Sequence, residues 1–353
     1  MVLHAPPHGP HGEPARTHGN RSRPRRRRDG EQRGGHTVTG RSRVLVLGAS
    51  GFVGRAVCAR LATCGIAVRA MTRDSVKARP LQVLPALEIF SGSPHDDDAL
   101  ARALDGVDAA VNLVGILHQS RRVPFEKIHV ELPRRIARAC RAAGVMRLVH
   151  MSALNASAGG PSEYLRSRGR GEVALREEGG GLAVTVFRPS VIFGEDDSFL
   201  NLFAALVRPL PVVPLAGART RFQPVWVEDV ARAVASSLDD ARSFGQSYDL
   251  CGPGTYTLAD IVRFVAGLQG RRRRILPLPA WAGLAQAFVL EYLPGPVMTR
   301  DNLASMKMDS VCACPFPEFL GIAPAAMEAI VPGYLASAGP RGRYSGYRRG
   351  VGR

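Results

Sequence analysis

The sequence predicts an α/β fold, with a doubly wound parallel sheet followed by a smaller C-terminal α/β domain. Two observations support this prediction. Short apolar runs, typical of strands buried on both faces of a sheet, alternate with helical stretches from residue 44 to residue 187. Beyond residue 190 the pattern changes to shorter helices separated by loops that contain many prolines.

The elements of the sheet are expected in alternating order. Strands are predicted over residues 44–47, 67–71, 109–114, 148–151 and 183–187. Helices are predicted from just after residue 54 to about residue 64, and over residues 97–104, 125–143 and 164–178. The acidic run at 96–98 fits a helix N-terminus, which the helix dipole favours, rather than a metal site. Right-handed crossovers join such strands into one twisted parallel sheet.

The C-terminal part is expected to return once to the sheet. A helix over residues 227–238 precedes a strand over 247–250 that should join the sheet edge, and four arginines at 271–274 predict a surface turn. Residues 280–293 predict a helix that is apolar nearly all round and contains Trp281 and Phe288. The expected parts are a basic tail (1–42), the sheet domain (43–190), a small domain (191–338) and a second basic tail (339–353).

Three regularly spaced glycines follow the first predicted strand, and a helix follows them. Such glycines permit a tight turn, close approach of a pyrophosphate and close packing of helix on strand, while the helix N-terminus offers free N–H groups to the phosphates. The sequence therefore predicts a Rossmann unit that binds a nicotinamide dinucleotide. The expected contacts in this loop are Gly48, Ser50, Gly51, Phe52, Val53 and Gly54.

The end of the second strand bears on the choice of cofactor. In NAD(H) sites an acidic residue about 20 positions after the glycines accepts the ribose hydroxyls, whereas an arginine there accommodates a 2′-phosphate. Arg73 lies just past the predicted strand tip and Asp74 follows it. We therefore expect NADP(H) rather than NAD(H), with the alternative that Asp74 holds the ribose and Arg73 is only solvated.

The net charge of +17 is concentrated at the two ends of the chain. Residues 1–43 carry ten arginines and three acidic residues, and residues 340–353 add five arginines and no acidic residue. Both segments are too poor in apolar residues to form a core, so we expect disordered tails. Binding of nucleic acid is expected, if at all, only through these tails.

Cysteine usage and hydropathy bear on the compartment. The six cysteines show no paired metal spacing, so all are expected to be reduced thiols and no metal site is expected. No apolar run reaches the roughly 18 residues that span a bilayer. We expect a cytoplasmic protein, with peripheral contact to the inner membrane through the basic tails and the 280–293 helix as an option.

At these residues the chain resembles the extended and atypical short-chain dehydrogenase/reductases, which are similar to NAD-dependent epimerases and dehydratases. The resemblance rests on the glycine spacing, on the segment 164–168 in the place of a Tyr-x-x-x-Lys motif, on the Arg-Pro segment 186–194 and on the segment 222–230. Segments 150–154, 198–203 and 293–301 also resemble the family of the NADPH-binding alpha-subcomplex subunit 9 of mitochondrial complex I and its bacterial relatives.

The resemblance implies the remaining site residues. It assigns Tyr164 as acid/base, Arg168 as its partner and Ser152 as the hydroxyl that orients the substrate. Arg168 replaces the usual Lys and stays protonated at any working pH, so it cannot relay protons. His129 stands where many members carry an Asn, and is interpreted as a packed residue. Gly92-Ser93 replaces a Gly-Asp pair near the adenine. Further cofactor contacts are implied at Val114, Gly115, Pro189, Ser190 and Val191.

Three hypotheses for the function follow. The first is an NADP(H)-dependent oxidoreductase acting on a hydrophobic carbonyl, alcohol or quinone-like molecule, with a nucleotide-sugar epimerase or dehydratase as a variant. The second is a non-catalytic NADPH-binding accessory or assembly subunit with respiratory-chain partners, as the complex I resemblance implies. The third, a nucleic-acid binder, rests only on the tails.

Overall fold

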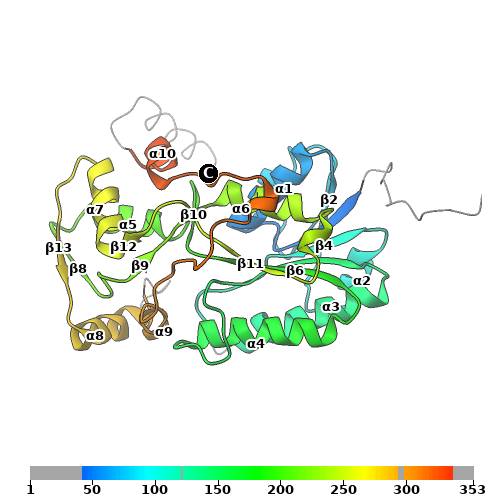
Figure 1. Ribbon diagram of the computed structural model, residues 1–353, viewed down its shortest axis with the longest axis horizontal. Helices are drawn as coiled ribbons and strands as arrows, with labels where there is room; N and C mark the ends of the chain where they lie inside the picture. The colour runs from blue at the N-terminus through cyan, green and yellow to red at the C-terminus, as the bar shows by residue number, and fades with distance from the viewer. Residues whose placement is uncertain (1–41, 121, 293–297, 337–353) are drawn as a thin grey trace, which may run out of the picture. The chain divides into compact units, whose positions relative to one another are not determined.

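A computed structural model describes residues 42–120, 122–292 and 298–336, which belong to one compact unit. The central sheet has seven parallel strands in the order β11-β6-β5-β4-β1-β2-β3 (Figure 1). Its strands are β1 (Arg43–Leu47), β2 (Ala67–Thr72), β3 (Leu87–Ser91), β4 (Ala109–Asn112), β5 (Arg147–Met151), β6 (Ala183–Pro189) and β11 (Ser247–Leu250). The predicted fold class is confirmed, including the return of 247–250 to the edge.

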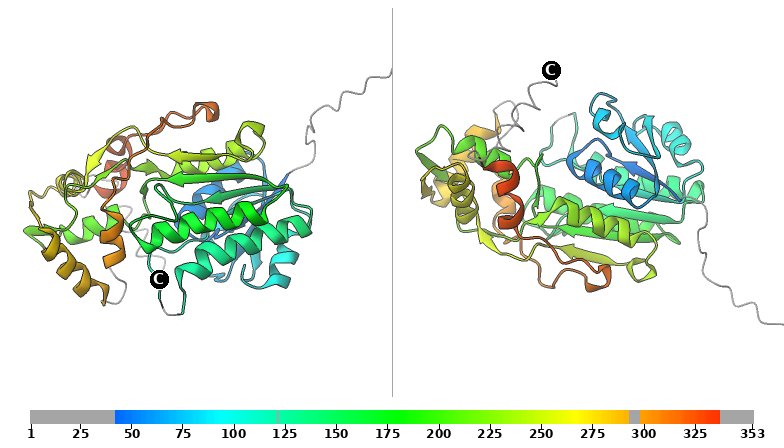
Figure 2. Two further views of the ribbon diagram at one scale, coloured as in Figure 1. Left: turned by 60° about the horizontal axis from the view of Figure 1, so that its bottom comes forward. Right: turned by 90° about the horizontal axis from the view of Figure 1, so that it is seen from above.

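Helices cover both faces of the sheet (Figure 2). In β1, Val44 and Val46 face one apolar cluster and Leu45 and Leu47 face the other, as alternation along a strand requires. The first cluster is closed by α1 (Phe52–Thr63) and α6 (Val227–Ser237). The second is closed by α2 (Asp97–Leu104), α3 (Leu132–Ala142) and α4 (Glu163–Glu178). The strand order turns between β1 and β4, where ligands bind at the carboxyl edge of such sheets.

Most of the residues after β6, apart from α6 and β11, form a small lobe with its own apolar core, centred on Phe193, Leu200 and Val262. Its strands are β7 (Ile192–Phe193), β8 (Val212–Leu215), β9 (Arg221–Phe222), β10 (Val225–Trp226), β12 (Tyr256–Thr257) and β13 (Arg274–Pro277). Its helices are α5 (Leu200–Leu206), α7 (Leu258–Leu268), α8 (Ala280–Glu291), α9 (Arg300–Ser305), α10 (Met327–Ile330) and α11 (Pro332–Leu335). Three short 3-10 turns complete the described elements: Arg79–Leu81, Ala241–Ser243 and Glu318–Leu320.

Several element boundaries differ from the predictions. The helix expected over 125–143 starts as a π-helical turn, Glu126–Glu131, and becomes α3 only at Leu132. Pro133 explains part of this, because it has no N–H to donate to the carbonyl of His129. The arginine turn is one residue shorter than expected, since Arg274 already begins β13. Both predicted tails lie outside the described residues, except for residue 42.

The expectation of six reduced cysteines is wrong for two of them. Cys251 and Cys312 form a disulfide, with Cα atoms 6.1 Å apart. They are 61 positions apart in sequence, so only the return of the chain to the sheet edge brings them together. Cys58, Cys64, Cys140 and Cys314 are free thiols. Within the described ranges, no helix is long and apolar enough to cross a bilayer.

Candidate functional site

The glycine loop joins β1 to α1 and has the geometry that a phosphate-binding turn needs. Gly48 has φ +83° and packs on the backbone of Leu113 and Val114. The N–H of Gly51 donates to the Gly48 carbonyl over 3.0 Å. A Cβ at Gly54 would lie 2.2 Å from that same carbonyl oxygen, so only glycine lets α1 sit this close. Gly51 caps α1 without a side-chain hydrogen bond, which leaves N–H groups for a phosphate.

The other predicted residues of this loop lie between β2 and the small lobe. The hydroxyl of Thr72, at the end of β2, is 3.0 Å from the hydroxyl of Ser50. The Phe52 ring packs against Gly194, where an added Cβ would meet ring carbons at 3.1 Å. Val53 packs against the sheet core. The loop is therefore held in place from both sides by residues far away in sequence.

Arg73 and Asp74, just past β2, have different environments. The Asp74 carboxylate accepts the N–H groups of Val76 and Lys77, at 3.0 and 3.2 Å, and so closes its own turn. Arg73 is exposed, and its guanidinium has no hydrogen-bond partner among the described residues. A charged group at the strand tip is thus available from Arg73, while Asp74 is already engaged. Gly92 of the Gly92-Ser93 pair donates its N–H to the Thr72 carbonyl.

At the opposite end of the site, α4 brings Tyr164 and Arg168 together. The Arg168 guanidinium carbon lies 5.4 Å from the centre of the Tyr164 ring. Nη1 of Arg168 donates to the Met151 carbonyl over 3.1 Å, and Nη2 lies 2.2 Å from where a Cβ on Gly115 would be. The loop after β4 therefore needs glycine at this position to admit the guanidinium.

Arg168 is a buried cation without a carboxylate partner. It is only 8% exposed, forms no ion pair within the described residues, and its Nε has no hydrogen-bond partner there. Burying a charge without a counter-charge is costly unless a ligand completes its environment. The arrangement fits a dinucleotide, whose ribose hydroxyls or phosphates would supply acceptors.

His129 supports Tyr164 and does not face the site as an acid or base. Its Nε2 accepts the N–H of Ile116 at 3.2 Å, and its Nδ1 lies 2.9 Å from the Ser167 hydroxyl, which donates to the Tyr164 carbonyl. Burial, with the nearby charge of Arg168, lowers the pKa of His129 to about 2, so the ring is neutral. The Tyr164 ring packs edge-on against it at 5.6 Å.

The hydroxyl of Ser152 is engaged by a buried carboxylate. It donates to Oε1 of Glu172 over 2.6 Å, and both residues are buried. Glu172 also accepts Nε of Arg188 at 2.9 Å and forms an ion pair with its Nη2. This network joins β5, α4 and β6 below the site. The hydroxyl of Ser152 is committed to it, which does not support the role that the resemblance implied.

The remaining predicted residues lie at the carboxyl ends of β4 and β6. The N–H of Val114 donates to Oδ1 of Asn112 over 3.1 Å. The Pro189 carbonyl accepts the N–H of Leu154, and the Val191 carbonyl accepts that of Val225. Ser190 donates its hydroxyl to the Ser310 carbonyl at 2.8 Å, a contact across 120 positions. All these residues share the edge of the sheet that carries the glycine loop.

Three buried polar groups beneath this edge, Glu172, Asn112 and His150, were not predicted from the sequence. Glu172 was hidden because a Glu in a helix is ordinarily solvated. Asn112 and His150, on β4 and β5, are joined by a 3.1 Å hydrogen bond. Burial lowers the pKa of His150 to about 3, so this pair is neutral as well. Polar residues inside otherwise apolar strands were the one available signal. No metal-ligand cluster occurs in the part of the chain that the structure covers.

Comparison with known proteins places the chain in a family. A family model described as NAD(P)H-binding matches residues 48–241. NADH dehydrogenase (ubiquinone) 1 alpha subcomplex subunit 9 from mouse mitochondria is 33% identical over 83% of this chain and 81% of that protein. Ceramide reductase from Caulobacter vibrioides is 30% identical over 67% of this chain and 73% of that protein.

The solved structures that match are similar in fold. The NADPH-dependent quinone oxidoreductase QOR2 from Escherichia coli, complexed with NADPH, superposes with a TM-score of 0.64 at 19% identity. The match covers 80% of this chain and 96% of that one. A dTDP-glucose 4,6-dehydratase from Streptomyces venezuelae with bound NAD gives a TM-score of 0.67 at 19% identity, covering 88% of this chain and 98% of that one.

Proposed function

Because this chain belongs to the NAD(P)H-binding family, and within it to the group of the complex I alpha subcomplex subunit 9 proteins, we propose that its cofactor is NADP(H) rather than NAD(H). The observation that carries this proposal is the contrast between Arg73 and Asp74. Asp74 uses its carboxylate to close its own turn, whereas Arg73 is exposed beside it without a partner among the described residues. An arginine in this place can pair with a 2′-phosphate.

Titration of the full chain with NADPH and with NADH, followed by nucleotide fluorescence, tests this proposal. Arg73→Ala should weaken NADPH binding about 10- to 100-fold, the size of a lost charge-assisted contact, and leave NADH binding nearly unchanged. Arg79→Ala is a matched control, because Arg79 is exposed in the following turn. An equal loss of affinity for NADPH and NADH in Arg73→Ala would contradict the assignment of Arg73 to the 2′-phosphate. Failure of the wild type to bind either nucleotide would overturn the proposal.

For the chemistry, we propose reduction of a hydrophobic carbonyl or quinone-like molecule. NADPH, when bound, supplies the hydride, and Tyr164 gives a proton to the substrate oxygen. Arg168 places a permanent positive charge beside the tyrosine ring and offers donors to the cofactor, but the proton must return to Tyr164 from solvent because a guanidinium does not release one. His129, neutral and hydrogen-bonded through Ser167, positions the first turn of α4.

Turnover of NADPH with menadione and with long-chain aldehydes tests this chemistry. Tyr164→Phe should lower kcat about 10²- to 10⁴-fold, the usual range for a general acid, with the NADPH Kd unchanged. Arg168→Lys should raise kcat, because a lysine can both bind the ribose and relay a proton. A Tyr164→Phe variant as active as the wild type would exclude this role.

A second candidate function is a non-catalytic NADPH-binding accessory subunit. Two observations favour it: Arg168 stands where active relatives are expected to carry Lys, and the Ser152 hydroxyl is engaged by Glu172. NADPH would then act as a ligand that stabilises the fold by mass action. A large rise of Tm with NADPH, together with no turnover on any substrate tested, would favour this function over the reductase.

Partners follow from the same alternatives. For the accessory function we propose a protein of the respiratory chain. For peripheral contact with a membrane we propose α8 and the residue that follows it: Trp281 and Phe288 in the helix are 76% and 49% exposed, and Tyr292 just after it is 72% exposed. Cosedimentation with anionic vesicles, compared between the wild type and Trp281→Ser, would test that contact. Binding of nucleic acid through the tails concerns residues outside those described.

A further inference from the structure

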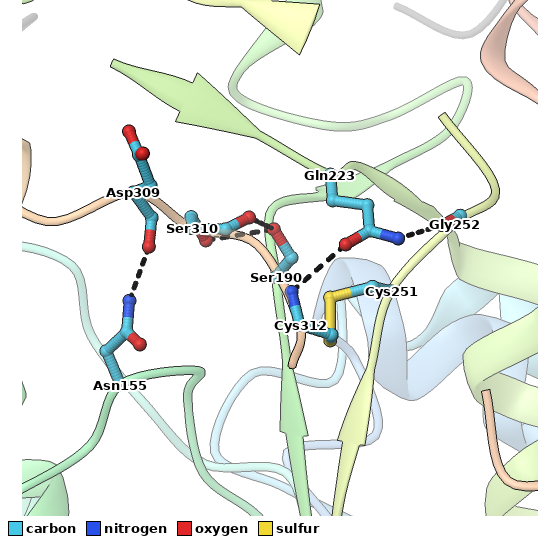
Figure 3. Close-up of a disulfide and its surroundings, with 8 residues drawn as sticks. All are labelled: Asn155, Ser190, Gln223, Cys251, Gly252, Asp309, Ser310 and Cys312. Atoms are coloured by element: carbon cyan, nitrogen blue, oxygen red, sulfur yellow. Dashed lines mark hydrogen bonds between the residues drawn. A yellow bond between two sulfur atoms is a disulfide. The ribbon is translucent and has the colours of Figure 1, made fainter. Parts of the chain in front are cut away.

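The disulfide lies at the same end of the sheet as Tyr164 and Arg168. Cys251 follows β11 directly, and Cys312 belongs to a segment of residues 308–314, which we call the crossing segment (Figure 3). The bond attaches this segment to the end of β11, where Leu250 is paired with Pro189 of the neighbouring strand β6. The bond also closes a loop that contains much of the small lobe.

The crossing segment contacts two of the loops that form the carboxyl edge (Figure 3). The side chain of Asn155, after β5, donates to the Asp309 carbonyl at 2.9 Å. The Ser190 hydroxyl, after β6, donates to the Ser310 carbonyl and lies 2.9 Å from the Ser310 hydroxyl. Ser190 is one of the residues at which the family resemblance implies a cofactor contact, in the Arg-Pro segment that closes over the nicotinamide in such proteins. The crossing segment is therefore a second support for that loop.

Gln223 links the two sides of the disulfide. Its Oε1 accepts the N–H of Cys312 at 3.0 Å, and its Nε2 donates to the Gly252 carbonyl at 2.7 Å. Toward the small lobe, the Asp309 carboxylate pairs with Arg221 at 2.8 Å. That pair is largely exposed, and exposed pairs contribute little. Among these attachments, the disulfide is the one covalent link between the crossing segment and the sheet.

Access to the bond is uneven. Cys251 is buried at 3% exposure, Cys312 is half-buried, and the free thiol Cys314 is exposed two residues further on. A thiolate from solvent can therefore reach the sulfur of Cys312 more easily than that of Cys251. Attack there forms a mixed disulfide with Cys312 and releases Cys251 as the leaving thiol.

We propose that Cys251 and Cys312 form a reversible redox site that sets how firmly the nicotinamide end of the cofactor is held. A dithiol reductant gives two electrons and two protons to the Cys251–Cys312 bond. The reductant becomes a disulfide, and the protein then carries two thiols. A disulfide oxidant reverses the step. In the oxidised protein the crossing segment holds Ser190 and Asn155 in place; in the reduced protein it can leave them. The coupling rests on the proposed binding of NADP(H).

The test compares the full chain oxidised with trans-4,5-dihydroxy-1,2-dithiane and reduced with dithiothreitol. Reduction should increase hydrogen exchange in residues 308–314. It should also weaken NADPH binding about 3- to 10-fold, because binding must then order one or two side-chain contacts that the oxidised protein already holds. Cys312→Ser should behave as the reduced protein under both conditions. Cys314→Ser, a matched exposed cysteine, should respond to the reductant as the wild type does.

The outcomes separate this inference from the proposed function. Two additional titratable thiols after reduction, with the expected exchange and a weaker NADPH Kd, would support the redox site. An unchanged Kd in the two states, with NADPH bound in both, would overturn the inference and leave the proposed function standing. No NADPH binding in either state would overturn both. Six free thiols under oxidising conditions would overturn the inference, whatever the NADPH Kd. If Cys312→Ser does not fold, the comparison of oxidised and chemically reduced wild type still tests the redox site.

Discussion

The two ends of the proposed cofactor site are built in different ways. At the end proposed for the phosphates, the geometry depends on backbone: Gly48 adopts a positive φ, and Gly54 leaves no room for a side chain. At the end proposed for the nicotinamide, the geometry depends on buried polar side chains, with Arg168 beside Tyr164 and a separate network around Glu172. The first end needs small residues at fixed spacing, whereas the second needs several partners from separate elements.

This difference predicts how a substitution at each end will affect stability and nucleotide binding. A backbone site fails when one atom is added, and the loss should be local to the phosphates. A buried polar network fails when one partner is removed, because the remaining buried charges or hydroxyls lose their hydrogen-bond partners. Three predictions test the contrast, beginning with the largest expected effect.

Removal of the Glu172 carboxylate should cost the most stability. Glu172→Ala leaves Arg188 without its ion-pair partner and Ser152 without its acceptor, and breaking such a buried pair costs about 3–5 kcal/mol. Glu177→Ala on the same helix is the control, because Glu177 is exposed and its pair with Arg134 spans 4.0 Å. Urea unfolding of both variants measures this; similar costs for the two would mean that the network does not stabilise the nicotinamide end.

Addition of one methyl group to the phosphate loop should have the next largest effect. In Gly54→Ala the new Cβ would lie 2.2 Å from the Gly48 carbonyl oxygen, so α1 must move away from β1. We expect a loss of about 1–3 kcal/mol in the free energy of unfolding and a clear loss of NADPH affinity. Gly267→Ala in α7 meets no atom within 4 Å and should be neutral or slightly stabilising. Undiminished NADPH binding by Gly54→Ala would show that the backbone fit is not needed.

The pH dependence of stability is the third prediction, and for each histidine its effect over a single pH unit is the smallest of the three. His129 and His150 have folded pKa values lowered to about 2 and 3 by burial, against about 6.5 unfolded. Below pH 6.5 the unfolded chain binds protons that the folded chain does not. Stability should therefore fall as the pH falls from 6.5 toward 3, by up to about 1.4 kcal/mol per pH unit for each histidine.

A variant isolates one of these two protons. His150→Gln should reduce the slope of unfolding free energy against pH by about one proton between pH 6 and 4, whatever its absolute stability. Above pH 7 the slopes of variant and wild type should coincide, which provides the internal control. Chemical unfolding at a series of pH values gives both slopes. An unchanged slope at low pH would mean that His150 titrates in the folded protein.

Much of the fold could be predicted because the relevant patterns are local. Asp96 followed by an apolar stripe predicted the helix Asp97–Leu104, and the structure has it with Asp96 capping the N–H of Ala99. The short run 247–250 was expected at the sheet edge and is there. The helix predicted over 125–143 begins irregularly because packing against α4 and Pro133 changes the first turn, which an average periodicity does not reveal.

The sequence by itself determined the parallel sheet, the glycine loop and the place of Tyr164, because spacing and hydrophobic pattern act over a few turns of chain. Only the tertiary structure decided which partners the polar groups find. Ser152 meets Glu172 across 20 positions, Ser190 meets Ser310 across 120, and Cys251 meets Cys312 across 61. The physical reason is that such contacts depend on how the strands are ordered and where the chain returns, and no local preference encodes either.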